Sequence, residues 1–326
     1  MIRSLIIGTG SYLPERVLTN RDLEKRVDTS DQWIMERTGI RERRIASDKE
    51  AASDLAVVAA RRALEMAQVK ATELDLIVVA TGTPDMLFPS TACLVQNHIG
   101  ASRAFAFDLS AACSGFLYAL SVGDQYVRTG SAQRVLIIGS EVMSMLMDWT
   151  DRSTCILFGD GAGAVVLKAH RGQRGILSTH LHSEGSLWDL ICVPGGGSRF
   201  PPSKETLEKR LNFLKMKGNE TFKVAVRTLE EAARETLKAN HFTIKDLDLV
   251  IPHQANLRII QSVAQRLGIP VEKMVINLQH YGNTSAASIP IALDEAVRTG
   301  RLKEGHLVLL EAFGGGLTWG SALIRW

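Results

Sequence analysis

Residues 62–80 read RALEMAQVKATELDLIVVA, and residues 235–253 read ETLKANHFTIKDLDLVIPH. Each stretch has the spacing of a helix, then a break, then an apolar run that opens on Leu-Asp-Leu. The offset is 173 residues, measured from Leu64 to Leu237 (237 − 64). A pattern that recurs along a chain indicates a repeated structural unit. We therefore ask whether the rest of the chain repeats in the same order.

Two further pairs of segments match. RVLIIGS at residues 134–140 resembles HLVLLEA at 306–312, with an offset of 172 (307 − 135). FDLSAACSG at 107–115 resembles INLQHYGNTS at 276–285, with an offset of 169 (278 − 109). Three matches in one order predict two copies of one unit, which meet near residue 170. We expect an N-terminal half at residues 1–170 and a C-terminal half at 171–326.

Short apolar runs alternate with longer helical patterns. The runs are rich in Val, Ile and Leu, which is typical of strands buried on both faces. Helical patterns span residues 53–68 and 219–240. This alternation predicts an α/β fold. The predicted strands are 5–7, 74–80, 135–138, 247–251 and 307–310. Residues 193–217, which contain PGGGSRFPPS, have no counterpart in the repeat, and we expect a loop there that covers a site.

Composition excludes several classes of protein. The 326 residues carry a formal net charge of +3, which is too even to indicate nucleic acid as the main partner. The four cysteines form no C-x-x-C pair, so neither a zinc site nor a disulfide framework is expected. No apolar run approaches the length of a membrane span, and the N-terminus lacks the pattern of a secretion signal. We expect a cytoplasmic protein without metal or membrane contact.

Cys113 is a candidate nucleophile. It follows a predicted strand in FDLSAACSGFLYAL, just before a helical pattern begins. The N–H groups and the dipole of a helix N-terminus favour a thiolate, and the small neighbouring residues leave room for a substrate. The alternative is a buried cysteine that acts only as a small apolar residue, which is the more common use.

His253 and Asn283 also come after predicted strands. His253 lies in LVIPHQANLRII, and Asn283 follows Gly282 in HYGNTSAASIPIAL. A loop histidine and a turn asparagine are the ordinary interpretations. Ligands bind beyond the carboxyl ends of the strands in α/β sheets, and a duplicated unit brings two such ends together. We therefore expect Cys113, His253 and Asn283 to share one pocket.

Two glycine-rich stretches need an interpretation. Three glycines follow Phe313 in FGGG, where the backbone either approaches a substrate closely or forms a flexible hairpin. FGDGAGA at 158–164 lacks the lysine of a phosphate-binding loop, and Gly8-Thr9-Gly10 does not complete a G-x-G-x-x-G motif. We interpret both of these as tight turns.

Together these motifs resemble the thiolase superfamily and, within it, the β-ketoacyl-[acyl-carrier-protein] synthase III family. The resemblance covers essentially the whole chain. It is carried by IIGTGSYLP, DTSDQWIMERTGIRERR, DLSAACSGF, FGDGAGA, PHQANLRII, GNTSAAS and EAFGGGLTWGSALIRW, in that order. It implies a five-layered αβαβα fold of two similar halves and a homodimer. It also implies that a short acyl-CoA, acetyl-CoA above all, condenses with malonyl-[acyl-carrier protein].

The resemblance also implies roles for single residues. Cys113 would carry the acyl group, while His253 and Asn283 would act on the malonyl group. The N–H groups of Cys113 and Gly315 would hold the oxyanion, and Phe313 would exclude water. Coenzyme A, which is a substrate and not a cofactor, would contact Trp33, Arg37, Arg152 and Asn256. Phe88 from a partner subunit would close the acyl pocket. Carrier proteins are acidic, so charge complementarity leads us to expect docking at a local basic patch of Arg258 and Lys223, although ordinary solvated surface charges are the alternative.

Other members of the superfamily fit less well. Elongating synthases have a second histidine where this chain has Asn283, thiolases have a further cysteine, and hydroxymethylglutaryl-type synthases add a glutamate base. An enzyme of secondary metabolism with another primer or acceptor stays open as the main alternative. A cysteine hydrolase and a non-catalytic acyl-CoA-binding protein are more distant ones, and a binder would not need Cys113.

Overall fold

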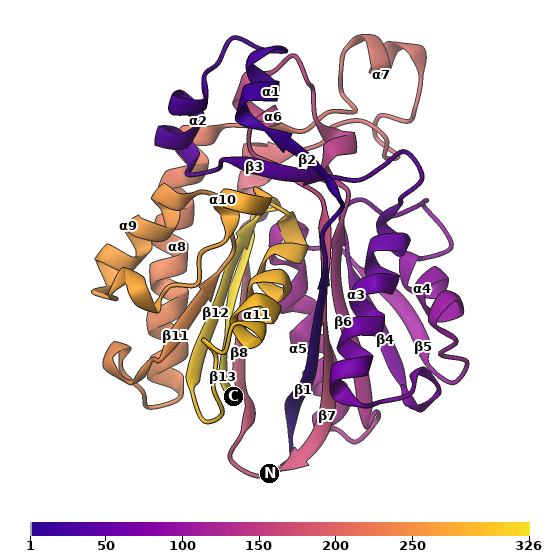
Figure 1. Cartoon of the computed structure of the whole chain (residues 1–326), viewed down its shortest axis with the longest axis vertical. Coiled ribbons are helices and arrows are strands. Elements are labelled where there is room, and N and C mark those ends of the chain that lie inside the picture. The colour runs from indigo at the N-terminus through magenta and orange to yellow at the C-terminus, as the bar shows by residue number, and fades with distance from the viewer. Residues whose placement is uncertain (1) are drawn as a thin grey trace.

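The computed structural model describes residues 2–326, which form two β-sheets packed between layers of helices (Figure 1). The first sheet has the strand order β1-β7-β6-β4-β5, and the second has the order β8-β13-β12-β11. The strands of the first sheet are β1 (Ile2–Tyr12), β4 (Leu76–Ala80), β5 (Phe105–Leu109), β6 (Arg134–Glu141) and β7 (Gly161–Arg171). Those of the second are β8 (Gly175–Ser183), β11 (Leu249–Pro252), β12 (Leu307–Gly314) and β13 (Thr318–Arg325).

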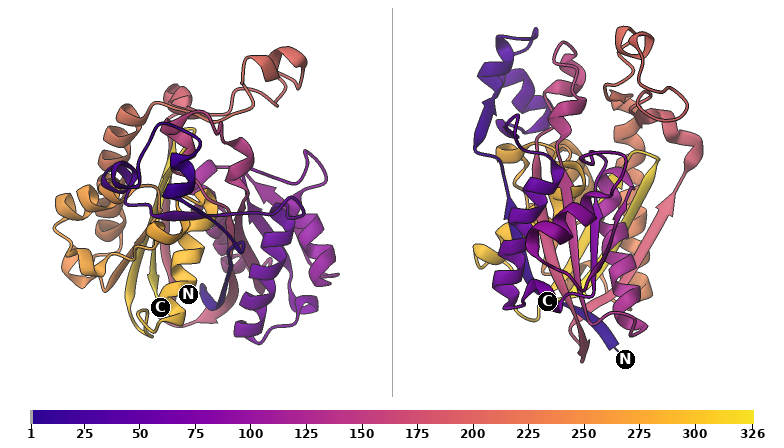
Figure 2. Two further views of the ribbon diagram at one scale, coloured as in Figure 1. Left: turned by 45° about the horizontal axis from the view of Figure 1, so that its top comes forward. Right: turned by 90° about the vertical axis from the view of Figure 1, so that its right-hand side faces the viewer.

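Helices fill three layers around these sheets (Figures 1 and 2). The outer layers are α3 (Ala52–Ala67) with α4 (Thr91–Ile99), and α8 (Gly218–Ala239) with α9 (Leu257–Leu267). Between the sheets lie α5 (Gly115–Arg128) and α11 (Ser288–Arg298). Three hydrophobic clusters correspond to this stacking: one under α3 and α4, one around α5 and α11, and one under α8 and α9. The expected α/β, five-layered αβαβα fold is confirmed.

The pleat explains why continuous apolar runs form the central strands. In β4, Leu76 and Val78 belong to the cluster between the sheets, whereas Ile77 and Val79 belong to the cluster under α3. Successive side chains of a strand point to opposite faces, so a strand covered on both faces must be apolar throughout. The five predicted strands all lie within or across β1, β4, β6, β11 and β12.

The two sheets share one topology, since β8-β13-β12-β11 follows the same path as β1-β7-β6-β4. Two of the three sequence matches were misaligned. Leu76 pairs with Val135 and Leu249 pairs with Val308, so the true offset of RVLIIGS is 173 (308 − 135) and not 172.

The match around Cys113 is further out of register. The 3-10 turns Ala112–Ser114 and Ser285–Ala287 precede α5 and α11 in the same way, and Ala112 and Ser285 are 173 residues apart (285 − 112). Cys113 therefore corresponds to Ala286, not to a residue four positions earlier. The loops before these turns differ in length, and this hid the true register.

Smaller elements complete the chain. A two-stranded antiparallel sheet of β2 (Arg16–Thr19) and β3 (Glu42–Ile45) crosses the top of the molecule with α1 (Asn20–Glu24), α2 (Asp31–Thr38) and α6 (Arg152–Cys155). The short helix α10 (Leu278–Tyr281) precedes Asn283. Residues 193–217 are less irregular than expected, because they contain α7 (Lys204–Glu208) and β10 (Lys215–Met216), which pairs with β9 (Ile191–Cys192). In Figure 2, α7 projects from the body of the molecule.

The interpretation of two glycine-rich stretches as tight turns is wrong. Gly8 and Gly10 lie within β1, and Gly161 begins β7. A Cβ atom on Gly10 would stand 2.4 Å from the carbonyl oxygen of Ala59 in α3. Glycine is therefore required here by close packing of a helix on a strand, which local sequence patterns do not distinguish from a turn.

Candidate active site

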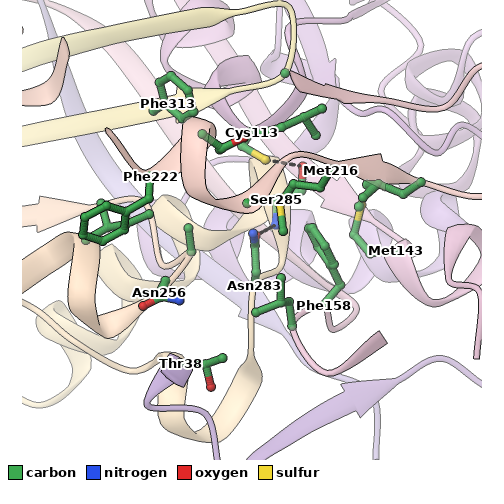
Figure 3. A pocket seen from close by; sticks show the side chains of 18 of the residues that line it. Thr38, Cys113, Met143, Phe158, Met216, Phe222, Asn256, Asn283, Ser285 and Phe313 are labelled. Carbon is green, nitrogen blue, oxygen red and sulfur yellow. Dashed lines mark hydrogen bonds between the residues drawn. The ribbon is translucent and has the colours of Figure 1, made fainter. Parts of the chain in front are cut away.

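A cavity of about 770 Å³ lies at the carboxyl ends of the central strands of both sheets (Figure 3). Cys113, His253 and Asn283 all line it, although they come from segments far apart in sequence. Of the other residues singled out in the sequence, those that also line it are Phe313, Gly315, Trp33, Arg37, Asn256, Arg258 and Lys223. Arg152 and Phe88 do not line it.

Cys113 occupies the middle of the 3-10 turn between β5 and α5. Gly314 packs directly on this turn, since a Cβ atom there would stand 2.7 Å from the Cys113 nitrogen. The Ser285 hydroxyl is 3.4 Å from the Cys113 sulfur. FGGG is thus both the β12–β13 hairpin and a close backbone contact with the nucleophile, so the two interpretations of this stretch are compatible.

The expected thiolate needs a correction. Burial raises the pKa of the Cys113 thiol to about 12; the hydrogen bond from Ser285 lowers it less, and the charge of Glu141 raises it further. The N-terminus of α5 follows at Gly115, as expected from the sequence. Desolvation by the apolar pocket outweighs these local dipoles, so the resting group is a thiol and its proton must be removed on attack.

His253 is almost fully buried, and its imidazole is neutral because burial lowers the pKa to about 3. Its Nδ1 atom lies 2.6 Å from the Ser288 hydroxyl oxygen, which also accepts the N–H of Gln254. Within residues 2–326, the Ser288 hydroxyl has no acceptor in reach other than Nδ1. Ser288 therefore donates to Nδ1, which places the imidazole proton on Nε2.

Asn283 has a fixed amide orientation. Its Oδ1 atom accepts the N–H of Ser285 at 2.8 Å, which leaves the amide N–H groups for the cavity. Its main chain is held by Leu157 and Gly159, whose carbonyl and N–H groups pair with it. The site therefore has two neutral donors, His253 Nε2–H and the Asn283 amide, next to a cysteine sulfur.

The apolar side of the cavity is formed by Met143, Phe158, Leu214, Met216 and Cys192, with the unmatched 193–217 segment as one wall. The expectation that this segment covers a site is therefore met. Cys192 shares the cavity with Cys113, which the sequence did not reveal. The other two cysteines are elsewhere: Cys93 is exposed and Cys155 is buried.

Aromatic and cationic side chains meet at the mouth. The guanidinium groups of Arg37 and Arg152 lie 5.6 and 5.2 Å from the centre of the Trp33 ring. Asn256 caps α9, because its side chain accepts the Arg258 N–H at 2.9 Å and donates to the Arg37 carbonyl at 3.1 Å. Part of its hydrogen-bonding capacity is therefore structural, which reduces what it can offer to a ligand.

Arg258 and Lys223 are both exposed at the mouth, Arg258 on the first turn of α9 and Lys223 on the second turn of α8. The Arg258 guanidinium lies 5.7 Å from the centre of the Phe222 ring, which is part of the cavity wall. A positive rim thus surrounds an apolar channel. Among residues 2–326, no cluster of three or more His, Cys, Asp or Glu side chains is arranged for a metal ion.

Sequence comparison agrees with this geometry. A model of 3-oxoacyl-[acyl-carrier-protein (ACP)] synthase III matches residues 107–185, and a model of its C-terminal region matches residues 237–326. The chain is 57% identical to a β-ketoacyl-[acyl-carrier-protein] synthase III of Xanthomonas campestris, over 100% of this chain and 99% of that protein.

The chain belongs to the β-ketoacyl-[acyl-carrier-protein] synthase III family.

Solved structures of the family have the same fold. The 3-oxoacyl-[acyl-carrier-protein] synthase III of Aquifex aeolicus superposes with a TM-score of 0.93 at 52% identity, covering 99% of this chain and all of that one. A priming β-ketosynthase from the R1128 polyketide pathway has a TM-score of 0.91 at 37% identity, covering 98% and 95%. Similarity to synthase III thus extends over the whole chain, including the 193–217 segment.

Sequence reasoning missed three polar residues of the site: Glu141, Ser285 and Ser288. The two serines stand in the GNTSAAS motif, so a signal for them was available. Glu141 ends the apolar run RVLIIGSE, where a charged residue at the carboxyl end of a buried strand was the signal.

Proposed function

We propose that the chain condenses a short acyl-CoA, acetyl-CoA in the first instance, with malonyl-[acyl-carrier protein]. The product is a 3-oxoacyl-[acyl-carrier protein], the first intermediate of fatty-acid synthesis. The observation that carries this proposal is the meeting of Cys113 with two neutral hydrogen-bond donors, His253 and Asn283, in one apolar cavity.

The first half-reaction loads the acyl group. The Cys113 sulfur attacks the thioester carbonyl of acyl-CoA, and coenzyme A leaves as the thiol. The main-chain N–H groups of Cys113 and Gly315 are suited to hold the oxyanion, because Gly314 brings the two segments into contact. Coenzyme A would place its adenine against Trp33, with Arg37 and Arg152 on the ring faces. Asn256 would contact its pantetheine arm.

The second half-reaction forms the carbon–carbon bond. Malonyl-[acyl-carrier protein] loses carbon dioxide, which leaves an enolate on the thioester oxygen. His253 Nε2–H and the Asn283 amide would donate to that oxygen. The carbanion then attacks the acyl-Cys113 thioester. Phe313, which is 6% exposed, would keep water from the reaction and so strengthen these hydrogen bonds.

The same proposal includes a carrier-protein docking site, a homodimer and a cellular location. The exposed cations Arg258 and Lys223 would dock the acidic carrier protein, and a homodimer would bring Phe88 to the acyl pocket of the partner. The enzyme would act in the cytoplasm. None of the helices within residues 2–326 is long and apolar enough to cross a membrane. Identity of 57% to a family member, against 37% to the polyketide priming enzyme, favours primary over secondary metabolism.

Mass spectrometry tests the proposal directly. Incubation with acetyl-CoA alone should add one acetyl group to the Cys113 peptide and none to Cys93, Cys155 or Cys192. Malonyl-carrier protein should then remove the acetyl group and yield an acetoacetyl product. Rapid release of acetate in its place would favour a hydrolase, and stable binding without transfer would favour a binding protein.

A further inference from the structure

The structure raises the question of which group takes the Cys113 proton during loading. Besides Cys113, the titratable side chains that line the cavity are Glu141, His253, Cys192, and the cations Arg37, Lys223 and Arg258 at the mouth. The three cations at the mouth are proton donors, and Cys192 is itself a thiol. Two candidates for a proton acceptor are left: His253 and Glu141.

His253 is a poor acceptor in this state. The Ser288 hydroxyl donates to Nδ1, so the remaining ring nitrogen, Nε2, already carries a proton. Taking a second proton would create an imidazolium in an almost fully buried position. The same bond that prepares His253 to donate to an enolate therefore removes it as a base for the thiol.

Glu141, in contrast to His253, can accept a proton, because its carboxyl oxygens are the acceptors in each of its hydrogen bonds. Its Oε2 atom accepts the Gly82 N–H at 3.0 Å and the Thr83 hydroxyl at 2.8 Å. The Thr83 oxygen in turn accepts the Val142 N–H at 2.8 Å, so its own proton points to Glu141. Such a set of donors fits a carboxylate, and it leaves Oε1 as the oxygen that can accept a proton.

Oε1 lies against the turn that carries Ser285 and Ala286. It accepts the N–H of Ala286 at a long 3.4 Å. Burial raises the pKa of the Glu141 carboxyl, and the hydrogen bonds from the Thr83 hydroxyl, the Gly82 N–H and the Ser285 hydroxyl each lower it by less. That hydroxyl lies 3.4 Å from the Cys113 sulfur, as the dashed line in Figure 3 shows. Ser285 has a left-handed φ of 48°, which a residue with a side chain rarely adopts, so the fold holds this hydroxyl in place at a cost.

We propose that Glu141 accepts the Cys113 thiol proton, through the Ser285 hydroxyl, when an acyl group is loaded. The proposal rests on the function proposed above. The Ser285 hydroxyl, which donates to the sulfur at rest, turns its proton toward Oε1, accepts the thiol proton on its oxygen and passes its own proton to Oε1, while the sulfur bonds to the thioester carbonyl carbon. When the bond from that carbon to the coenzyme A sulfur breaks, the leaving thiolate takes the proton back by the same route. Acyl-CoA and the thiol thus become acyl-cysteine and coenzyme A thiol.

Glu141→Gln separates this role from a simple charge effect. The negative charge of Glu141 raises the pKa of Cys113. If Glu141 acted through its charge alone, the neutral glutamine would make the thiol more reactive. If Glu141 accepts the thiol proton, the glutamine makes the thiol less reactive. We expect the variant to react about 10²-fold more slowly at pH 7, with its rate rising only at higher pH. Rates are measured between pH 6 and 9, with acetyl-CoA and, separately, with iodoacetamide, by intact-mass spectrometry.

Three further variants sharpen the test. Ser285→Ala should slow loading similarly, and the double variant should lose little more than either single one, because both interrupt one path. Glu141→Asp should recover part of the rate. Glu311→Gln is the matched control, since Glu311 is an equally buried carboxyl that does not line the cavity, and its loading rate should stay unchanged.

Unchanged or faster loading by Glu141→Gln in a protein that melts like the wild type would overturn the relay. A wild type that iodoacetamide alkylates but acetyl-CoA does not acylate would contradict the proposed function instead, and the alkylation rates would still decide the role of Glu141. If preloaded Glu141→Gln also condenses as slowly as it loads, the residue supports the site as a whole and the relay is wrong.

Discussion

At the scale of single residues, one hydrogen bond decides what the rest of a side chain can do. Ser285 N–H occupies the oxygen of Asn283 and so turns its amide nitrogen toward the cavity. Ser288 likewise commits one nitrogen of His253 and leaves the other as a donor. Both donors are neutral, so they stabilise negative charge that forms during decarboxylation without drawing a counter-charge into an apolar pocket.

Asn283→Ala should separate the two half-reactions. The amide acts on the enolate, whereas acyl transfer to Cys113 relies on the main-chain N–H groups. We expect the variant to be acylated by acetyl-CoA but to release carbon dioxide from malonyl-carrier protein about 10²- to 10³-fold more slowly, as for loss of one oxyanion donor. Labelled carbon dioxide and the Cys113 adduct are measured on the same sample. A variant that decarboxylates normally but cannot be acylated would refute these roles.

At the scale of elements, β12 carries a buried acid with no partner. Glu311 is 0% exposed, and neither of its carboxylate oxygens has a hydrogen bond. It pairs across the strands with Ser321 of β13, on the sheet face that α8 covers. Burial raises its pKa to about 8. The folded protein therefore holds this proton over a pH range where the unfolded chain has lost it.

This difference makes stability depend on pH. A carboxyl whose pKa is higher in the folded state stabilises fully below the unfolded value of 4.5, and this contribution is lost as pH rises through 8. We expect Glu311→Gln to lessen the decline in the free energy of unfolding between pH 4.5 and 8, by up to about 1.4 kcal/mol per pH unit. Urea unfolding at pH 5 and pH 8.5 measures this, and an equal change at both values would show that the carboxyl is not titrating.

The first turn of α9 places Arg258 at the mouth, which allows a test of carrier-protein docking. Arg258→Glu should raise the KM for malonyl-carrier protein, because a negative charge there repels an acidic partner. The wild-type KM should depend strongly on salt. Loading of Cys113 from acetyl-CoA should change little. Arg103→Glu reverses an exposed charge at the opposite end of the first sheet and serves as the control. An equal fall in loading and condensation would assign Arg258 to the site itself.

At the scale of the whole molecule, an exposed apolar loop stands apart from the cavity. Leu87 and Phe88 are 87% and 83% exposed, and Met86 is 47% exposed. Large apolar side chains this exposed favour contact with another protein surface. In the proposed homodimer, Phe88 would end the acyl pocket of the partner and limit the length of the primer.

Phe88→Thr should therefore widen the range of acyl chains. A smaller side chain leaves space for further methylene groups, since packed pockets tolerate little excess volume. We expect loading of longer acyl-CoA substrates to increase while acetyl loading persists, as measured by a series of acyl-CoA chain lengths on Cys113. Light scattering establishes whether both proteins are dimers. A wild type that prefers chains of ten or more carbons would contradict this role of Phe88.

The sequence by itself determined the fold class, the duplicated unit and the family, because buried strands, their spacing and long motifs are local patterns. It also selected Cys113, His253 and Asn283, each of which follows a strand. It did not distinguish the packed glycines of β1 from turns, because close contact between a strand and α3 depends on atoms far apart in the chain.

Only the tertiary structure decided how the site residues work. The helix N-terminus beside Cys113 is visible in the sequence, but the apolar walls that outweigh it come from residues 143–158, 192–193 and 214–216. The donor state of His253 depends on Ser288, 35 residues away, and Glu141 contacts Ala286 only because two copies of one unit meet there. Desolvation and hydrogen-bond direction are properties of a three-dimensional environment, and for this reason proton positions could not be predicted from residue types alone.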